Sequence, residues 1–111
     1  MKDEFSNIQE QILVMDAQDG DAQALDKLID RWQKPLWKHA YRILGDTHGA
    51  WDVTQQSWMG IIKGIGKLQD PDGFKAWAYR IVTNKSFDWI RKNKKQKHVN
   101  LDELPEIAKS K

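Results

Sequence analysis

The sequence predicts an all-α fold of three main helices preceded by a shorter N-terminal helix. Apolar residues recur at steps of three and four along most of the chain, which is the period of a helix with one buried face. No segment shows the alternation of apolar and polar residues that a half-buried strand requires. Six tryptophans among 111 residues supply large apolar areas for one small core, so we expect a single domain.

The first helix is expected to be short. Ser6 is a preferred N-cap residue and Gly20 a preferred stop, so the helix should lie between them. Its predicted buried stripe consists of Ile8, Ile12, Leu13 and Met15.

A longer second helix should follow, capped by Asp19 or Asp21 and ended by Gly45. Pro35 lies inside this segment. Because proline lacks a backbone N–H and clashes with the preceding turn, we expect a kink or a break at residues 32–34. The predicted apolar face consists of Leu25, Leu28, Ile29, Trp32, Leu36, Ala40, Tyr41 and Leu44.

The third helix is expected to start after the Gly45-Asp46 turn, with Asp46 or Thr47 as its cap. Glycines at positions 60, 64 and 66 weaken its end, since each costs about 1 kcal/mol relative to alanine inside a helix. The residues expected to be buried are Ala50, Val53, Trp58, Ile61, Ile62 and Ile65.

The fourth helix is expected after the loop KLQDPDG, with Asp72 as its N-cap. Its predicted inner stripe consists of Phe74, Trp77, Ala78, Ile81, Val82 and Trp89, so both tryptophans are assigned mainly to the core. We expect residues 1–96 to form the helical domain. Residues 97–111, which change from basic to acidic, should be a flexible tail or the start of a linker.

Charge is segregated along the chain, although the formal net charge is only +2. Residues 1–72 carry 8 basic and 12 acidic side chains, residues 73–98 carry 8 and 1, and residues 99–111 carry 2 and 3. The basic segment predicts a polyanionic partner. The acidic remainder is left to repel nucleic acid or to contact another protein.

The fourth helix carries this positive charge opposite its apolar stripe. Residues at three- and four-residue steps form one outward face, namely Arg80, Asn84, Asp88, Arg91 and Lys95. Cations on such a face can neutralise phosphates, Asn84 can hydrogen-bond a base edge, and an exposed ring can stack on an unpaired base. Lysine-rich helix ends also occur without a ligand, because cations are favourable near a helix C-terminus. Composition alone leaves both interpretations open.

Several motifs resemble region 2 of the extracytoplasmic-function (ECF) sigma factors of bacterial RNA polymerase. The motifs GDAQAL, LGD, AWDVTQQSW, FKAWAYRIVTN and DWIR follow the order and spacing of that family's pattern over residues 19–96. The specific part is FKAWAYRIVTN followed by DWIR, whereas LGD alone would mean little. The resemblance implies a sigma region 2 bundle that docks on the coiled coil of the polymerase β′ subunit. It also implies recognition and melting of the minus-ten promoter element, held as single-stranded non-template DNA.

The resemblance also implies roles for named residues. Polymerase contacts fall on Asp52, Gln55 and Gln56. A pocket for one flipped base falls on the loop of residues 67–73, with Lys67, Gln69, Asp70 and Asp72. Promoter contacts fall on Arg80, Asn84 and Lys85. The outward face of the same helix and its neighbouring cations extend this predicted set to Asp88, Arg91, Lys92 and Lys95.

The chain departs from the family pattern at several points. Trp51 and Gln56 stand where the family usually has acids, and Thr54 stands where it commonly has a small apolar residue. The chain ends at Lys111, before the domain that reads the minus-thirty-five element in full members, so we expect a fragment or an unusual short protein. The alternative function is a helical protein-interaction module repurposed from a sigma domain, which would bind an acidic or anti-sigma partner.

Other functional classes have little support. The chain has no cysteine, and its three histidines share no metal-ligand spacing, so neither a metal nor a cofactor is expected. No phosphate-binding glycine loop and no Ser/His/Asp set is present, so an enzyme is not expected. No signal peptide or membrane span is apparent, which favours the cytoplasm.

Overall fold

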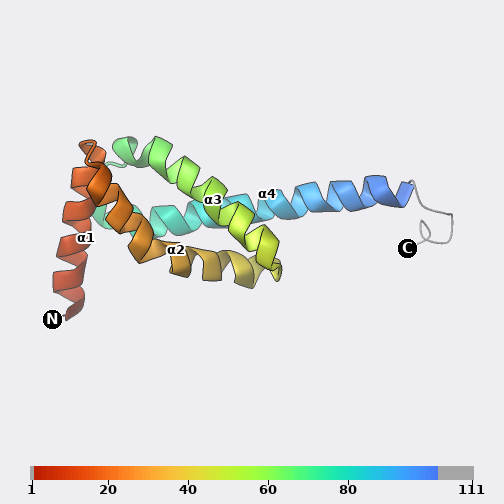
Figure 1. The fold of residues 1–111 in the computed structure, drawn as a ribbon, viewed down its shortest axis with the longest axis horizontal. Coiled ribbons are helices and arrows are strands. Elements are labelled where there is room, and N and C mark those ends of the chain that lie inside the picture. The colour runs from red at the N-terminus through yellow and green to blue at the C-terminus, as the bar shows by residue number, and fades with distance from the viewer. Residues whose placement is uncertain (1, 103–111) are drawn as a thin grey trace.

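The computed structural model describes the backbone of residues 2–102 and the side chains of residues 6–94. Within this part of the chain the fold is all-α, as predicted, with the helices α1 (Lys2–Gln18), α2 (Ala22–Leu44), α3 (Thr47–Gly64) and α4 (Phe74–Asp102). Two short 3₁₀ turns, Ile65–Lys67 and Pro71–Gly73, join α3 to α4. In Figure 1, α2 and α3 pack beside the first half of α4, and the second half of α4 extends beyond them.

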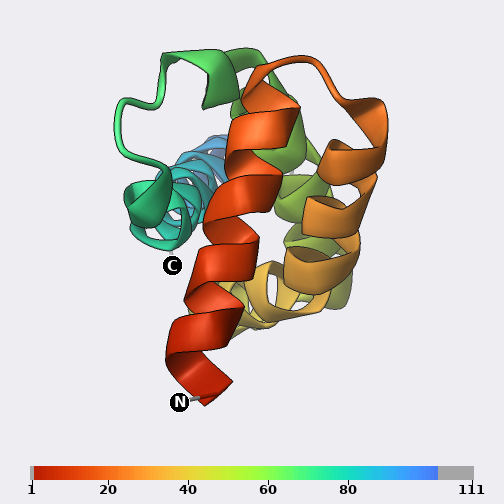
Figure 2. The ribbon, with the colours of Figure 1, turned by 90° about the vertical axis from the view of Figure 1, so that its left-hand side faces the viewer.

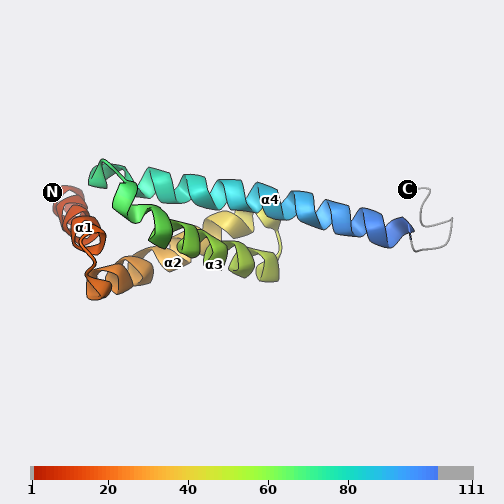
Figure 3. The same ribbon diagram turned by 90° about the horizontal axis from the view of Figure 1, so that it is seen from above.

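The core lies where α2, α3 and α4 meet, and α1 crosses one end of this bundle (Figure 2). Each helix contributes fully buried apolar side chains, namely Val14, Leu28, Leu36, Ala40, Ala50, Val53, Ile61, Phe74, Ala78 and Val82. Viewed from above, α4 runs along one side of the α2–α3 pair (Figure 3). One face of α4 is therefore committed to the core and the opposite face to solvent.

Helix α1 differs from its prediction in both its start and its buried face. It begins at Lys2, so Ser6 lies inside the helix, where it accepts hydrogen bonds from Arg31. The predicted stripe is wrong at three of its four positions, because Ile8, Ile12 and Met15 are 55%, 52% and 51% exposed, whereas Leu13 packs against the core as predicted. The buried side instead carries Val14, flanked by residues 13 and 17.

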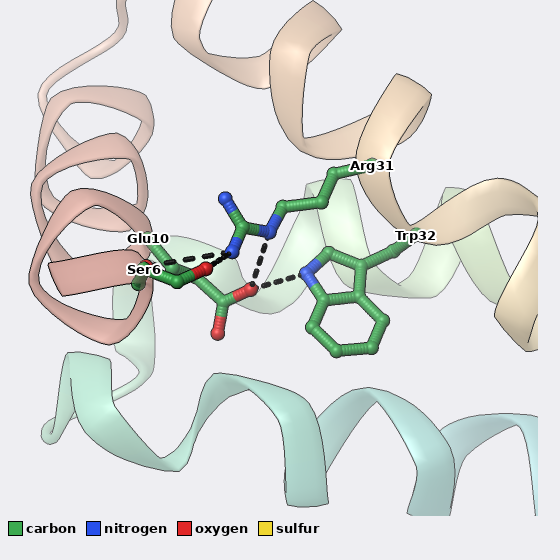
Figure 4. Close-up of polar contacts among 4 residues, drawn as sticks. All are labelled: Ser6, Glu10, Arg31 and Trp32. Atoms are coloured by element: carbon green, nitrogen blue, oxygen red, sulfur yellow. Dashed lines mark hydrogen bonds and ion pairs between the residues drawn. The ribbon is translucent and has the colours of Figure 1, made fainter. Parts of the chain in front are cut away.

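Polar contacts to α2 explain this choice of face. Figure 4 shows the Glu10 carboxylate accepting a hydrogen bond from the Trp32 indole and pairing with Arg31 at 3.4 Å. Glu10 is nearly buried, with only 12% of its side chain exposed. Because a buried carboxylate must be paired, the contact fixes how α1 is rotated about its axis.

Helix α2 begins and ends as the sequence indicated. The Asp21 side chain accepts hydrogen bonds from the backbone N–H of Gln23 and Ala24, at 2.9 and 3.3 Å. Gly45 ends the helix in the left-handed conformation, at φ 65°. Pro35 does not break the helix, and Figure 1 shows α2 changing direction between its first and second halves.

Helix α3 is capped by Asp46, whose side chain accepts from the Gly49 N–H at 2.8 Å. The expected burial holds for most of its apolar residues, but Ile62 is 46% exposed and so does not belong to the core. Thr54, although polar, is buried, and its hydroxyl donates to the Ala50 carbonyl at 2.6 Å. This bond satisfies the hydroxyl within the helix, which explains how a polar residue occupies an apolar position.

The start of α4 differs from its prediction. The sequence predicts Asp72 as its cap, but Asp70, two residues earlier, supplies the capping carboxylate and caps the 3₁₀ turn before α4 by accepting from the Asp72 N–H at 3.0 Å. The reason is the 3₁₀ turn of residues 71–73, which precedes the helix and needs a cap of its own. Helix α4 continues past residue 96 to Asp102, and the rest of the expected tail, residues 103–111, lies outside the described residues.

Candidate nucleic-acid and protein interfaces

The outward ridge of α4 carries part of the predicted DNA-binding set. Arg80, Asn84 and Arg91 are exposed, whereas Asp88 is half-buried. Asp88 and Arg91 form an ion pair one turn apart on the same helix. Phe87 lies on this ridge with 49% of its surface exposed. The ridge therefore combines cations, an amide and an exposed ring on one helical surface, while the Lys95 side chain lies outside the described residues.

Lys85 and Lys92 lie on a different flank of α4. Both line a groove between α3 and α4, together with Gln56, Met59 and Lys63. Three lysines in this groove make its wall strongly basic. The structure thus divides the predicted DNA-binding residues between the outward ridge and the flank that faces α3.

A second basic flank, on α2, was not predicted from the sequence. Lys34, Lys38 and Arg42 line a hollow beside Pro35, with His39 and Tyr79. The spacing of four residues places these three cations on one side of the helix and is visible in the sequence. The prediction of this helix rests on the neighbouring apolar face and leaves its cations out. Tyr79 of α4 lines the same hollow, so the three cations of α2 lie next to α4.

His39 connects the basic flank of α2 to α4 through two contacts. Its Nε2 atom and the Thr83 hydroxyl are 2.8 Å apart, and its ring lies edge-on to Tyr79 with centroids 4.9 Å apart. Burial lowers the pKa of His39 below its usual range, and the nearby Arg42 charge lowers it further. We therefore expect a neutral ring that positions α2 against α4.

The loop before α4 exposes all four residues predicted to form a base pocket, Lys67, Gln69, Asp70 and Asp72. Helix α1 holds this loop at both ends. The Gln18 amide donates to the carbonyls of Ile65 and Leu68 at 2.9 and 2.7 Å, and Gln11 donates to Asp72 at 3.0 Å. Two of the four predicted residues, Asp70 and Asp72, thus also have structural partners.

The predicted polymerase-docking residues Asp52, Gln55 and Gln56 all lie on the exposed side of α3. Apolar side chains accompany them, since Trp51, Met59 and Ile62 are 42%, 61% and 46% exposed. An exposed apolar patch among polar residues is typical of a protein-binding surface. The α3 face therefore adds exposed apolar area, and its Gln56 and Met59 also border the basic groove that Lys85 and Lys92 line.

The described residues offer no cluster of three or more His, Cys, Asp or Glu side chains suited to a metal ion. Among the same residues, no helix combines the length and apolar character needed to cross a bilayer.

Comparison with known families identifies the fold. The family model described as Sigma-70 region 2 matches residues 28–96, which is more than half of the chain. The chain belongs to the Sigma-70 region 2 family. The match includes α3, the loop and the basic part of α4, so each surface described above falls mainly within the region 2 domain.

Three sigma factors illustrate the relationship. The chain is 33% identical over 75 residues to ECF RNA polymerase sigma factor SigW of Bacillus subtilis, covering 68% of this chain and 40% of the relative. It is 31% identical over 81 residues to ECF RNA polymerase sigma factor SigE of Mycolicibacterium smegmatis, covering 73% and 30%. It is 32% identical over 76 residues to RNA polymerase sigma-H factor of Pseudomonas aeruginosa, covering 68% and 39%.

These matches confirm the resemblance to ECF sigma factors that the motifs indicated. The chain spans less than half the length of these three relatives.

Proposed function

We propose that this region 2 domain is a DNA-binding specificity factor for transcription initiation. It docks on the β′ subunit of RNA polymerase through α3 and holds the melted minus-ten element along α4. The observation that carries the proposal is the exposed ridge of Arg80, Asn84 and Phe87 on a helix whose opposite face is core. The cations suit phosphates, the amide suits a base edge and the ring suits an unstacked base.

The domain would favour strand opening by binding single-stranded DNA more tightly than duplex DNA. Separating stacked base pairs costs a few kcal/mol per step, so the surface must hold the single strand better than the duplex. The exposed ring offers a stacking surface worth about 1–3 kcal/mol per base, available only when the base is unpaired. Lys34, Lys38 and Arg42 supply further charge for the backbone on the α2 side. The non-template strand is the proposed ligand.

The loop of residues 67–73 is the proposed site for one flipped base. Its tip exposes Lys67 and Gln69, which offer an ammonium donor and an amide to a base edge. Hydrogen bonds from Gln18 and Gln11 hold the loop against α1, which reduces the entropy lost when a base is captured.

Docking on polymerase is assigned to the exposed α3 face. Asp52 supplies a charge, Gln55 and Gln56 supply hydrogen-bonding groups, and Met59 adds apolar area. The alternative is an interaction module whose basic α4 helix meets an acidic or anti-sigma partner and does not contact DNA. The two functions differ in whether the basic α4 ridge binds a strand.

The test is fluorescence anisotropy of the chain with single-stranded oligonucleotides of varied sequence, paired with capture of core polymerase. Arg80→Ala and Asn84→Ala should weaken strand binding, and Asn84→Ala should do so in a sequence-dependent way. The exposed residues Lys27 and Asn7, distant in sequence from α4, provide matched controls. Asp52→Ala should reduce polymerase capture without weakening strand binding. Wild-type affinity in both α4 variants would contradict the DNA-binding function and favour the interaction module.

A further inference from the structure

An open groove of about 580 Å³ lies at the seam between α2 and α3, and its role is not explained by strand binding. Asp30, Gln33, Lys34, Trp37 and Trp51 line it. The two indole rings come from different helices and touch, with centroids 5.6 Å apart and planes tilted by 39°. Aromatic surface from both helices therefore borders one hollow.

The aromatic wall of the groove is braced. Trp37 stacks on Tyr41 with centroids 5.2 Å apart and an interplanar angle of 12°. Tyr41 and Trp51 are each 42% exposed, so each ring keeps free surface for a ligand. Because three rings support one another, a ligand would meet a surface that is largely preorganised.

Charges around the groove favour a cation. Asp30 lines the groove, Asp26 lies one turn earlier on α2, and Asp52 directly follows Trp51 on α3. All three carboxylates are exposed. Lys34 is an opposing charge, but it also lines the basic hollow beside Pro35 and so marks the boundary between two differently charged surfaces. Asp30 is the carboxylate that lines the groove, so a cation there could pair with Asp30 while it meets the ring faces. The phosphates of a nucleic acid could pair with Lys34 but would be repelled by Asp30.

We propose that this groove receives an arginine side chain from a protein partner. A guanidinium is planar, stacks on indole faces and can pair with a carboxylate such as Asp30 at the same time. The groove adjoins the α3 face assigned to polymerase docking, so the identity of the partner rests on that proposed function. The preference of the groove for an arginine side chain does not depend on that proposed function.

The test uses two capped alanine-based peptides of equal length, one carrying arginines and the other the neutral isostere citrulline. Each is titrated into the ¹⁵N-labelled chain, and the indole N–H resonances of Trp37 and Trp51 report on the groove. We expect the arginine peptide to shift both resonances and to bind about fivefold tighter than the citrulline peptide. Trp51→Leu should bring that ratio close to one, and Trp51→Phe should preserve part of it.

Lys34→Ala distinguishes an arginine from a nucleobase as the occupant. Removing this like charge should tighten the arginine peptide about twofold, whereas it should weaken any binding of single-stranded oligothymidine. Asp30→Asn should weaken the arginine peptide, and because this site is exposed the variant is expected to fold. Equal affinities of the two peptides would overturn the proposal.

Capture of core polymerase distinguishes this inference from the proposed function. Polymerase capture together with equal peptide affinities would remove the arginine site and leave the docking role in place. Failure of polymerase capture together with a clear arginine preference would refute docking on polymerase and support the groove as the site of a different partner.

Discussion

The Gln18 side chain donates a hydrogen bond to the backbone carbonyl of Leu68 at 2.7 Å, across fifty residues of sequence. The same amide nitrogen also donates to Ile65 at 2.9 Å. One side chain of α1 therefore holds two consecutive parts of the loop that is proposed to receive a base. This relationship makes α1 a structural support for the loop.

Replacing Gln18 with alanine should loosen the loop. The variant loses two hydrogen bonds to backbone carbonyls, each with a net contribution of about 1 kcal/mol, so unfolding should become easier by about 1–2 kcal/mol. Amide hydrogen exchange of residues 66–70 should speed up more than exchange in α3. Gln9→Ala, an exposed site on the same helix, should change neither quantity. Unaltered loop exchange in the Gln18 variant would contradict this role.

Gly49→Ala should destabilise the protein although alanine is the better helix former. A Cβ atom at this position would lie 2.6 Å from Cζ2 of Trp89, so the ring or the helix must shift. We expect a net loss of about 1–3 kcal/mol in the free energy of unfolding, measured by urea denaturation. Gly66→Ala is the control, since a Cβ there meets open space.

A double-mutant cycle checks the steric origin of the Gly49 effect. Combining Gly49→Ala with Trp89→Phe should cost less than the sum of the two single changes, because phenylalanine lacks the fused ring that the new methyl group meets. Strict additivity would show that the Gly49 effect arises elsewhere.

Glu10→Ala should destabilise the junction of α1 and α2. Trp32 would lose the acceptor of its indole N–H and Arg31 would lose its ion pair, at a cost of about 1–3 kcal/mol. Glu10→Gln keeps an acceptor for the indole and should cost less. Asp16→Ala, on an exposed part of α1, is the control for loss of a carboxylate. The measurement is thermal or urea unfolding, and equal effects of Glu10→Ala and Asp16→Ala would exclude a specific contact.

His39 should make stability depend on pH. Burial and Arg42 lower its pKa in the folded state, so the unfolded chain binds more protons between that pKa and the ordinary value of about 6.5. Stability should therefore fall as the pH drops below about 6.5 and level off below the folded pKa. The facing groups are Lys34, Lys38, Arg42, Tyr79 and Thr83, so no facing carboxylate offsets the penalty among the described residues that line this hollow or contact the ring.

The measurement is urea unfolding at a series of pH values from 5 to 8. His39→Asn should flatten this part of the stability profile, whereas His48→Asn, at an exposed position, should leave it unchanged. If the stability of His39→Asn still falls with pH in this range, the pH dependence arises from another group.

The sequence by itself determined where the helices lie and what limits most of them. Asp21, Asp46 and Gly45 act as expected, because caps depend on backbone groups within a few residues. The inner stripe of α4 was equally predictable, since its apolar residues form one narrow series and its Arg80 and Asn84 fall opposite to it.

Only the tertiary structure decided which of several possible surfaces each helix uses. Apolar residues of α1 fit more than one stripe, and the contact of Glu10 with Trp32 selected the face that leaves Ile8 and Ile12 in solvent. Packing likewise turned Lys85 toward α3 and brought the α2 cations beside α4. The helical period defines faces relative to one axis only, so the neighbour of each face depends on contacts between residues far apart in the chain.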